Sequence, residues 1–508
     1  MASIPFPLGS YPGRRTHESA GRLINAYAEP LGPGAVDAAK IVSSAGLEKF
    51  TEAVTDFPEP GGVALTGYRG AIFVGSTLYV AFSDILVTVN EDGTVTSVGA
   101  LPNVSTGDFD PVADRVQFSR NNKQPPPPPA PPTGPTPDVV ATTSDGRSYL
   151  CSTSAPPAFF DVAPPGMSEV TSVFMDGYTF YGDAFGTIQA SQINDAATFN
   201  ALDVTTVQAK AGQLRRLIAY DQHLFAMCNT WIEVFRNVGN LEGFPFGRVA
   251  VINRGLIATF AVAGYQDGFG KALVWVGDDN GVHILDGYTA TRISTPDVDR
   301  DIEALTDKSS IEAQCYITSG AAFVSVSSTE WTWEFNLTTQ QWNERRSKLR
   351  DGTLLDRWRA TGDSVFAFDR WLIGDTHSGK LHEITSDARM EDDAALVMRI
   401  ESAPVSDFPR GISVPRADFN FSPGTGRAPG EDPIETDPQV MVSWTDDGGL
   451  HWSNPLWRSL GRQDTNPAIT VLRTGRTAAQ GRRWALEISD PVYVSLLGGD
   501  MTAEAEVG

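Results

Sequence analysis

Three acidic residues at alternate positions, Asp297, Asp299 and Asp301, are spaced in a way that suits metal chemistry. Carboxylate oxygens are the ligands that calcium prefers, and an EF-hand loop begins with such a run. That loop also needs glycine at its sixth position and glutamate at its twelfth, where this chain has Ile302 and Lys308. We therefore expect no calcium site here.

The same stretch carries the signals of a helix start. Thr295 is a residue type that caps helices, and Pro296 suits the first helical position. Val298, Ile302 and Leu305 recur on one face of a helix. The sequence predicts a capped helix over residues 294–306, with the acidic side chains at its positive end.

Asp375, His377 and His382 form a second candidate cluster for a metal or for acid–base catalysis. They lie at a turn that recurs elsewhere in the chain without histidine, which favours a role in the turn over metal binding. The chain has no Gly-x-Ser-x-Gly elbow and no His-Glu-x-x-His motif, and residues 268–272 lack the spacing of a phosphate-binding loop. We expect no catalytic residue, no metal, no cofactor, and hence no enzyme.

A motif near the C-terminus matches the Asp-box, a β-hairpin turn found in sialidases and other β proteins. The spacing is Thr445-x-Asp447-x-Gly449-x-x-Trp452. The aspartate accepts hydrogen bonds from turn amides, the glycine permits a positive φ, and the tryptophan packs under the turn. The motif predicts a structural hairpin and says little about catalysis.

Six arginines, against the single acidic residue Asp464, occupy positions 458–483. They are Arg458, Arg462, Arg473, Arg476, Arg482 and Arg483. Arginine prefers carboxylate and phosphate partners. Three interpretations stay open: docking onto acidic subunits of an assembly, contact with DNA, or a set of surface and cross-strand pairs.

The elements that position these residues are β-hairpins repeated from Val173 to Ile384. Their tight turns begin at 182, 228, 277, 327 and 374, so successive spacings are 46, 49, 50 and 47 residues. A period near 40–50 residues with strand signals indicates a β-propeller with about four strands per blade. We predict an all-β fold with a β-propeller of six or seven blades, in preference to an array of β-sandwiches.

The chain divides into three predicted parts. Residues 1–60 form an N-terminal arm and a ring-closing strand, with residues 22–29 as the strand candidate. Residues 61–395 form the propeller, interrupted by a proline-rich insertion at 124–137 that cannot be a central strand. Residues 396–508 form a small C-terminal domain that resembles a β-sandwich.

Composition narrows the class of protein further. The 508 residues carry a formal net charge of −23, which opposes coating of DNA because phosphate binding needs clustered Lys and Arg. The three cysteines are far apart and odd in number, so we expect reduced side chains and assembly in a cytoplasm. We see neither an apolar run long enough to insert into a membrane nor a secretion signal.

Several motifs in order along most of the chain resemble the tail-hub or tail-nozzle proteins of short-tailed bacteriophages, also called packaged-DNA-stabilisation proteins. The segments that carry the resemblance are 22–29, 285–288 with 292–295, 333–342 with 344–345, 372–375 with 379–381, 442–449 with 452–453, 457–458, 460–461 and 489–491. The proline-rich insertion departs from the family pattern.

The resemblance implies a structural virion protein that forms a ring, a homohexamer, in the phage tail below the portal and adaptor. Such a ring retains packaged DNA and conducts it during ejection without binding it specifically. Its partners are copies of itself, the head-to-tail connector and other tail proteins. A cyclic ring needs two different patches on each subunit, for which the N-terminal arm, the 294–306 helix and the arginine-bearing C-terminal unit are candidates.

Two rival functions remain open at this stage. The Asp-box and the tryptophans Trp331, Trp333 and Trp342 would also suit a glycan-binding or sialidase-like propeller. A sialidase needs arginines, a tyrosine nucleophile and acids that converge on the propeller axis. The third class is a scaffold whose proline-rich loop recruits other proteins.

Overall fold

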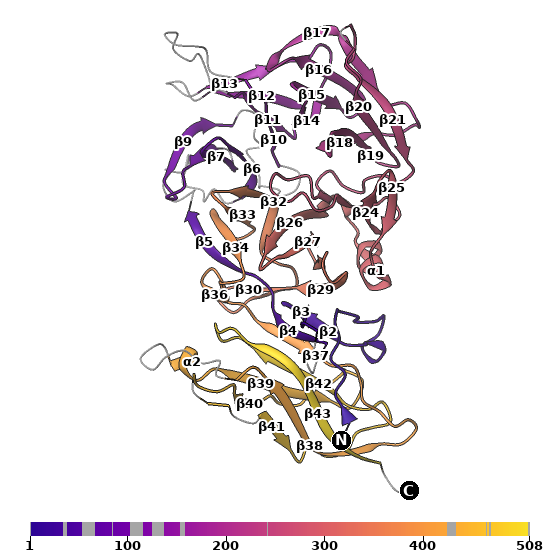
Figure 1. The fold of residues 1–508 in the computed structure, drawn as a ribbon, viewed down its shortest axis with the longest axis vertical. Coiled ribbons are helices and arrows are strands. Elements are labelled where there is room, and N and C mark those ends of the chain that lie inside the picture. The colour runs from indigo at the N-terminus through magenta and orange to yellow at the C-terminus, as the bar shows by residue number, and fades with distance from the viewer. Residues whose placement is uncertain are drawn as a thin grey trace.

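Strands dominate the computed structural model of the chain, which describes residues 2–33, 38–52, 67–83, 85–101, 115–123, 137–152, 158–240, 242–423, 433–463, 465–466 and 469–505. Nearly all of the proline-rich insertion therefore lies outside the described residues. A ring of small sheets forms the larger body, and a layered β structure lies below it in Figure 1.

Seven antiparallel groups of four strands make up the larger body in the part of the chain that the structure describes. Five are separate four-stranded sheets, and the other two belong to a nine-stranded and a six-stranded sheet. The first three are β6–β9 (Tyr68–Val74, Thr77–Phe82, Ile85–Val89, Val95–Ala100), β10–β13 (Gln117–Arg120, Val139–Thr143, Arg147–Ser152, Ala158–Val162) and β14–β17 (Glu169–Met175, Tyr178–Asp183, Thr187–Gln192, Asp195–Thr206). The next three are β18–β21 (Leu214–Tyr220, His223–Cys228, Ile232–Asn237, Phe246–Ile252), β22–β25 (Val262–Ala263, Val274–Val276, Val282–Asp286, Thr289–Arg292) and β26–β29 (Glu312–Thr318, Ala321–Ser327, Thr332–Asn336, Gln341–Arg345). The seventh contains β32 (Ala360–Ala367), β33 (Arg370–Asp375) and β34 (Lys380–Thr385).

The seventh blade takes its fourth strand from the beginning of the chain. Strand β5 (Gly46–Glu52) pairs antiparallel with β34, so its sheet joins residues more than 300 positions apart. The innermost strands β32 and β6 are also packed side by side, which brings the last blade against the first. The fold is thus the predicted β-propeller, and the described residues form seven blades, the larger of the two expected numbers.

The predicted strand at residues 22–29 differs from the observed structure. Asn25 has a positive φ of 52°, and the chain breaks there into β2 (Arg22–Ile24) and β3 (Ala26–Pro30), which enter different sheets. Strand β5, which also lies within residues 1–60, closes the propeller, and β2 and β3 do not. The expected N-terminal arm is instead part of the lower body, since Leu23, Ala26 and Ile4 lie in its core.

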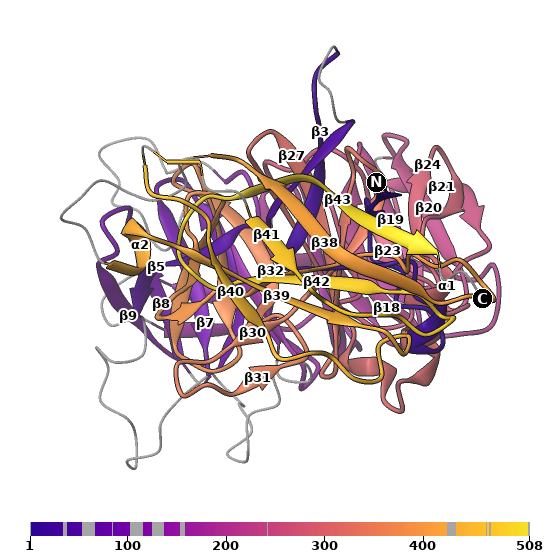
Figure 2. The same ribbon diagram turned by 90° about the horizontal axis from the view of Figure 1, so that it is seen from below.

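Two sheets facing one another form this lower body, a β-sandwich that Figure 2 shows from below. One sheet contains β1 (Ala2–Ser3), β3, β4 (Ala39–Ser43), β43 (Ser495–Ala505), β38 (Ile412–Phe421) and β41 (Ile469–Leu472). The other contains β2, β37 (Met398–Glu401), β42 (Arg483–Ile488), β39 (Gln439–Thr445) and β40 (Leu456–Ser459). The chain returns to the sandwich at β37, directly after the propeller strands.

Propeller and sandwich share one continuous sheet. Ile24 of β2 pairs in parallel with Glu344 of β29, so the sixth blade continues into the second sandwich sheet. The remaining short elements are β30 (Ser347–Lys348), β31 (Leu354–Leu355), β35 (Met390–Glu391), β36 (Ala394–Ala395), α2 (Pro433–Thr436) and the 3-10 turns Thr16–Glu18 and Lys308–Ser310.

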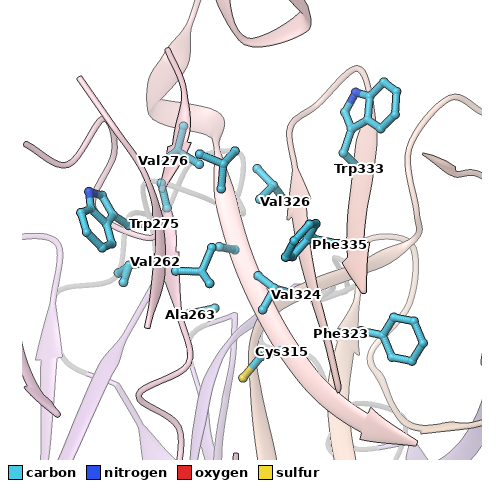
Figure 3. Packing of buried hydrophobic residues seen from close by; sticks show 14 of the residues in the cluster. Val262, Ala263, Trp275, Val276, Cys315, Phe323, Val324, Val326, Trp333 and Phe335 are labelled. Carbon is cyan, nitrogen blue, oxygen red and sulfur yellow. The ribbon is translucent and has the colours of Figure 1, made fainter. Parts of the chain in front are cut away.

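Apolar side chains fill the space between neighbouring blades. Val262 and Val276 of the fifth blade belong to one buried cluster with Val324 and Val326 of the sixth (Figure 3). Phe323, next to Val324 in the strand, points the other way, because successive strand residues face opposite sides. One blade cannot bury its own faces, so the ring depends on this contact repeated between blades.

Helix α1 (Pro296–Ala304) occupies the predicted stretch on the outside of the propeller. Val298, Ile302 and Leu305 are buried as the spacing predicts. Thr295 stands at the N-cap position but its side chain makes no capping hydrogen bond. The expected side-chain cap is therefore absent, and the Ser294 hydroxyl donates to the Asp299 carboxylate at 2.5 Å.

Candidate functional site

The Asp-box residues close a turn after β39. The Asp447 carboxylate accepts hydrogen bonds from the Leu450 and His451 amides at 3.1 and 3.0 Å, and from the Thr445 hydroxyl at 2.7 Å. Gly449 has a φ of +99° and donates its amide to the Thr445 hydroxyl. These hydrogen bonds hold the pKa of Asp447 well below its usual range. The arrangement is that of a rigid turn.

Trp452 lies at the boundary between the two bodies. The guanidinium groups of Arg399 and Arg483 lie over its ring, 5.0 and 5.9 Å from the centroid. These contacts are cation–π interactions, which sequence spacing could not have indicated because Arg399 comes from a distant strand. Trp452 therefore contacts Arg483, which is one of the six candidate arginines, and Arg399.

Two of the six candidate arginines are buried and paired inside the sandwich. Arg482 forms a two-pronged ion pair with Asp446, with both N–O distances at 2.8 Å. Arg483 pairs with Glu401 at 2.9 Å and donates to the Thr16 carbonyl at 2.9 Å. Because both side chains are buried and paired, they stabilise the sandwich from inside. For these two arginines the structure supports the third interpretation, a set of cross-strand pairs.

The other four candidate arginines lie at one edge of the sandwich, where β40 and β41 end the two sheets. The Arg458 guanidinium joins the two edge strands by donating to the Thr470 carbonyl at 3.1 Å. Arg462, Arg473 and Arg476 are exposed. We call Arg458, Arg462, Arg473 and Arg476 the basic edge, and only this part of the predicted set faces outward.

A cleft of about 630 Å³ lies at the junction of propeller and sandwich. It gathers the N-terminal segment, α1, the sixth blade and the Asp-box hairpin, which are the segments that the sequence had singled out separately. Its charges are largely matched: Arg22 pairs with Glu344 through two contacts of 2.9 and 2.5 Å. Such ion pairs hold the propeller and the sandwich in place against each other. They also leave little net charge in the cleft to attract a ligand.

The three acids of α1 have separate partners. Asp297 pairs with Arg300, Asp299 pairs with Arg292 at 2.8 Å, and Asp301 accepts the Trp333 indole N–H at 2.8 Å. Burial raises the pKa of Asp301. Within the described ranges no group of three His, Cys, Asp or Glu residues has the geometry to hold a metal ion.

Asp375, His377 and His382 are likewise not assembled as a ligand set. Asp375 forms a two-pronged ion pair with Arg359 at 3.2 and 2.6 Å and accepts the His377 amide at 3.1 Å. His382 is buried 3.8 Å from Asp392. The carboxylate of Asp375 is therefore used to fix its turn and Arg359.

A second cavity, about 550 Å³, lies on the propeller axis. Innermost strands of the first four blades and the seventh line it, with half-buried apolar side chains such as Ile72, Phe118 and Phe366 in its wall. Asp267 and Arg120 form an exposed ion pair of 3.0 Å on its lining. We call this cavity the axial pit.

Paired charges close the inner end of the axial pit. The Arg216 guanidinium and the Tyr265 hydroxyl both donate to one carboxylate oxygen of Asp363, each at 2.8 Å. The ring of Phe260 lies against Arg216 at 5.0 Å and against Arg115 at 5.3 Å. Arg115, Arg216 and Phe260 are all buried at this end of the axial pit.

The axial cluster could not be recognised from the sequence. Arg115 pairs with Glu312 at the axis although 197 residues separate them, and Arg216 is 147 residues from Asp363. Arg216, Glu312 and Asp363 stand in three different innermost strands, Arg115 lies just before a fourth, and the four residues share no motif. The only signal was the propeller prediction itself, since such folds bring strand residues to their axis.

Arginines, a tyrosine and acids do converge on the axis, as a sialidase-like site would require. Each arginine is however paired with an acid of the chain, Arg216 with Asp363 and Arg115 with Glu312. Burial raises the pKa of Tyr265 well above its ordinary value, which opposes its action as a nucleophile. The cluster is suited to holding blades together.

The three cysteines, Cys151, Cys228 and Cys315, are buried and form no disulfide. Burial raises the pKa of the Cys151 thiol to about 12, which keeps it in the unreactive protonated form. Among the described helices there is none whose length and apolar character would allow it to cross a membrane.

These features define a class: a seven-bladed β-propeller joined to a β-sandwich, with its clustered charges paired inside the fold. Residues 136–389, half of the chain, match the phage stabilisation family described as "Bacteriophage P22 Gp10, beta-propeller", and the chain belongs to this family. The resemblance seen in the sequence is therefore confirmed. Membership makes the chain a phage tail protein that stabilises packaged DNA, with a place in the virion.

Two solved structures show low overall similarity to the chain. The computationally designed protein Ika8 is 10% identical with a TM-score of 0.37, covering 66% of this chain and 99% of its own. BamB from Moraxella catarrhalis is 12% identical with a TM-score of 0.36, covering 72% of this chain and 97% of its own. Likeness at this level carries no argument about function. None of the curated proteins matches the chain.

Proposed function

We propose that the chain forms a homohexameric ring in the tail, below the portal and adaptor, which retains packaged DNA and conducts it at ejection. The observation that carries this proposal is the family match over residues 136–389, which runs from β11 of the second blade to β34 of the seventh. The remaining blade and the sandwich lie outside that match, so their part in the ring is argued from their own surfaces.

The proposed ring places the DNA channel between subunits. A 550 Å³ pit has the size of a site for a small molecule, and its inner end is filled by Arg216, Asp363 and Phe260. A DNA duplex therefore has no path along the axis of one propeller. A subunit of net charge −23 suits a channel wall, because it repels phosphates and lets the duplex slide.

Two surfaces of opposite charge suit the contact between neighbouring subunits. The basic edge of the sandwich carries exposed arginines, with the exposed side chains Trp457 and Leu472 beside it. Four exposed acids belong to the fifth blade, to α1 and to the residues just after α1: Asp278, Asp286, Glu303 and Asp307. We call these four the acidic rim, and a cyclic ring requires two such different patches on each subunit.

The proposed role needs no catalysis. The alternative, a sialidase-like or glycan-binding propeller, draws on the Asp-box and on the axial arginines. It is the weaker proposal because Asp363 and Glu312 already neutralise those arginines. Hydrolysis of a panel of chromogenic glycosides by the purified chain, lost in Asp363→Asn, would favour the alternative.

Loss of the gene from the phage tests the proposed function directly. Particles made without the protein should package DNA and then lose it, giving heads that sediment as empty, and supplied wild-type protein should restore filled heads. Filled, infectious particles in the absence of the protein would contradict a role in DNA retention.

A further inference from the structure

Four phenylalanine rings line the axial pit and keep part of their surface exposed. They stand in the innermost strands of the first, second, third and seventh blades, and each is half-buried: Phe73, Phe118, Phe174 and Phe366. The lining also contains polar side chains, among them Arg120 and Asp267. The face of a phenyl ring attracts a cation, and a volume of about 550 Å³ suits a small molecule.

The direction of the innermost strands shows on which face of the propeller the axial pit opens. Strands β18 and β32 leave the Arg216–Asp363 pair at the inner end and run past the lining residues Ala219 and Phe366 to tight turns. Because each blade is an antiparallel meander, its first and third turns lie on the same face. We call this face, on which the pit opens, the mouth face.

Exposed acids occupy the turns of the mouth face. The turns that follow β14, β18 and β32 carry Asp176, Asp221 and Asp369, each two or three residues beyond the last lining residue of its strand. The outer turns of the same face add three further exposed acids: Glu91, Asp92 and Glu242. A cationic ligand that approaches the pit is therefore surrounded by carboxylates.

Most cations near the mouth already have an acidic partner. The ion pairs, with N–O distances of 3.0, 3.0 and 3.1 Å, are Arg120–Asp267, Lys123–Asp138 and Arg370–Glu383. Arg236 and Lys271 are exposed on the same face without an ion pair in the described part of the chain. They are outnumbered by the acids of the turns, so the mouth face keeps a net negative charge.

We propose that the axial pit binds a small organic cation, an ammonium or guanidinium group on an apolar stem. The stem packs against the phenyl rings, and the cationic head lies toward the acids of the mouth face, where water still reaches it. An anion of the same shape meets the carboxylates of the turns and the negative faces of the rings. The Arg216–Asp363 pair at the inner end is neutral overall and does not reverse this preference.

Two sources can supply this chemistry, a free amine or the side chain of a lysine or arginine in another tail protein. The second source rests on the proposed tail function, because an assembled tail would bring such a side chain to the pit. The pit and its preference for cations do not rest on that function.

Three probes with one apolar body test the ligand class: phenylpropylamine, phenylpropanol and phenylpropionate. Calorimetry on the purified chain should show one site for the amine, with the alcohol about fivefold weaker and the carboxylate at least about tenfold weaker. Added salt should weaken binding of the amine and leave the alcohol unchanged, because salt screens exposed charges. No binding of the amine, or equal binding of the amine and the carboxylate, would overturn the proposal.

Neutralising the turn acids tests whether the mouth face sets the preference. Asp176, Asp221 and Asp369 have positive φ values of 50°, 46° and 59°, which asparagine tolerates well, so their joint replacement by asparagine should leave the fold intact. The triple variant should bind the amine about fivefold or more weakly and the alcohol unchanged. Wild-type affinity for the amine in the folded triple variant would overturn the role of these acids.

Matched controls locate the bound probe. Replacing three exposed acids of the sandwich by their amides, at Asp407, Asp500 and Glu504, removes the same charge and should not change binding. Phe118→Leu keeps an apolar side chain but removes a ring, so it should weaken the amine about threefold or more. Phe185→Leu, in the β15–β16 turn on the opposite face, should have no effect. Equal effects of the pit variants and their controls would place the probe elsewhere and overturn the assignment.

A comparison of the free chain with purified virions separates the two sources. If another tail protein supplies the cationic side chain, phenylpropylamine should bind the free chain and fail to bind the protein in tails. Binding to tails as well would overturn the protein source and assign the pit to a free amine. Neither result depends on whether the protein retains DNA, which the gene-loss experiment tests separately.

Discussion

Arg22 and Glu344 form a two-pronged ion pair that joins the first strand of the second sandwich sheet to the last strand of the sixth blade. Their strands meet through one parallel pair, Ile24 with Glu344. Because so little backbone pairing crosses this junction, we infer that the ion pair contributes much of the fixed orientation between propeller and sandwich.

Glu344→Gln should destabilise this junction. The Glu344 side chain is 9% exposed, so the change leaves a largely buried guanidinium without its counter-charge, at a cost of about 1–3 kcal/mol. Urea unfolding followed by tryptophan fluorescence measures the effect. Glu383→Gln is the matched control, since its pair with Arg370 is half-exposed and should cost under about 1 kcal/mol. Equal losses in the two variants would contradict the inference.

Gly374→Ala should weaken closure of the propeller. A Cβ atom at Gly374 would lie 2.1 Å from the ring of Tyr68, which is fully buried where the seventh blade meets the first. Neither Gly374 nor Gly498 has a positive φ, so alanine is compatible with the backbone at both. We expect a loss of about 1–3 kcal/mol or more for Gly374→Ala by thermal unfolding. Gly498→Ala, which meets no atom within 4 Å, should be neutral.

Glu169 should make stability depend on pH. Burial raises the pKa of its carboxyl from 4.5 to about 7, so between these values the folded chain binds more protons than the unfolded chain. Stability from this group is therefore present below about pH 4.5 and is lost as pH rises through about 7. The full loss is at most about 3 kcal/mol, and less where water reaches the carboxyl.

Denaturation of Glu169→Gln across this pH range checks the sign. The variant should lack the fall in stability and should exceed the wild type at pH above about 7. The exposed Glu48→Gln variant should keep the wild-type profile. A Glu169→Gln protein whose stability still falls by the wild-type amount would assign the dependence to another group.

Reversal of charge on the basic edge should block ring formation while leaving the subunit folded. Arg462 and Arg473 are exposed, so replacing both with glutamate removes attraction to the acidic rim without disturbing a core. Mass photometry should show at least about a tenfold weaker ring. Arg350→Glu is the control, since its side chain is 81% exposed and lies on neither surface.

A compensating change identifies the partner surface. Asp286→Arg with Glu303→Arg should restore rings in the arginine-reversed protein, because the two surfaces then attract with opposite signs. Rings that persist in the Arg462 and Arg473 double variant, or that the acidic-rim changes fail to restore, would assign the subunit contact to other surfaces.

The propeller was predictable because one connection repeats in the same place. The five turns beginning at 182, 228, 277, 327 and 374 all join the second and third strands of consecutive blades, the third to the seventh. Because this turn is short in each blade, its polar residues recur in the sequence once per blade. The period gives the blade architecture but contains no information about which distant strand completes the ring.

The remaining features depend on contacts between residues far apart in the chain. Residues 22–29 look like one strand, and only the positive φ of Asn25 sends its two halves into different sheets. In the sequence, Arg482 and Arg483 look like part of an exposed charged run. In the structure they are buried and paired with Asp446 and Glu401. Local patterning predicts strands and turns, whereas burial of a charge depends on where its partner lies.

The copy number and position of the protein in DNA-filled virions test the central claim most directly. Quantitative mass spectrometry of purified particles, with antibody labelling under the electron microscope, gives both. The account predicts about six copies per particle on a closed cyclic ring, with the label at the tail. Absence of the protein from filled particles, or a label spread over the head, would contradict it.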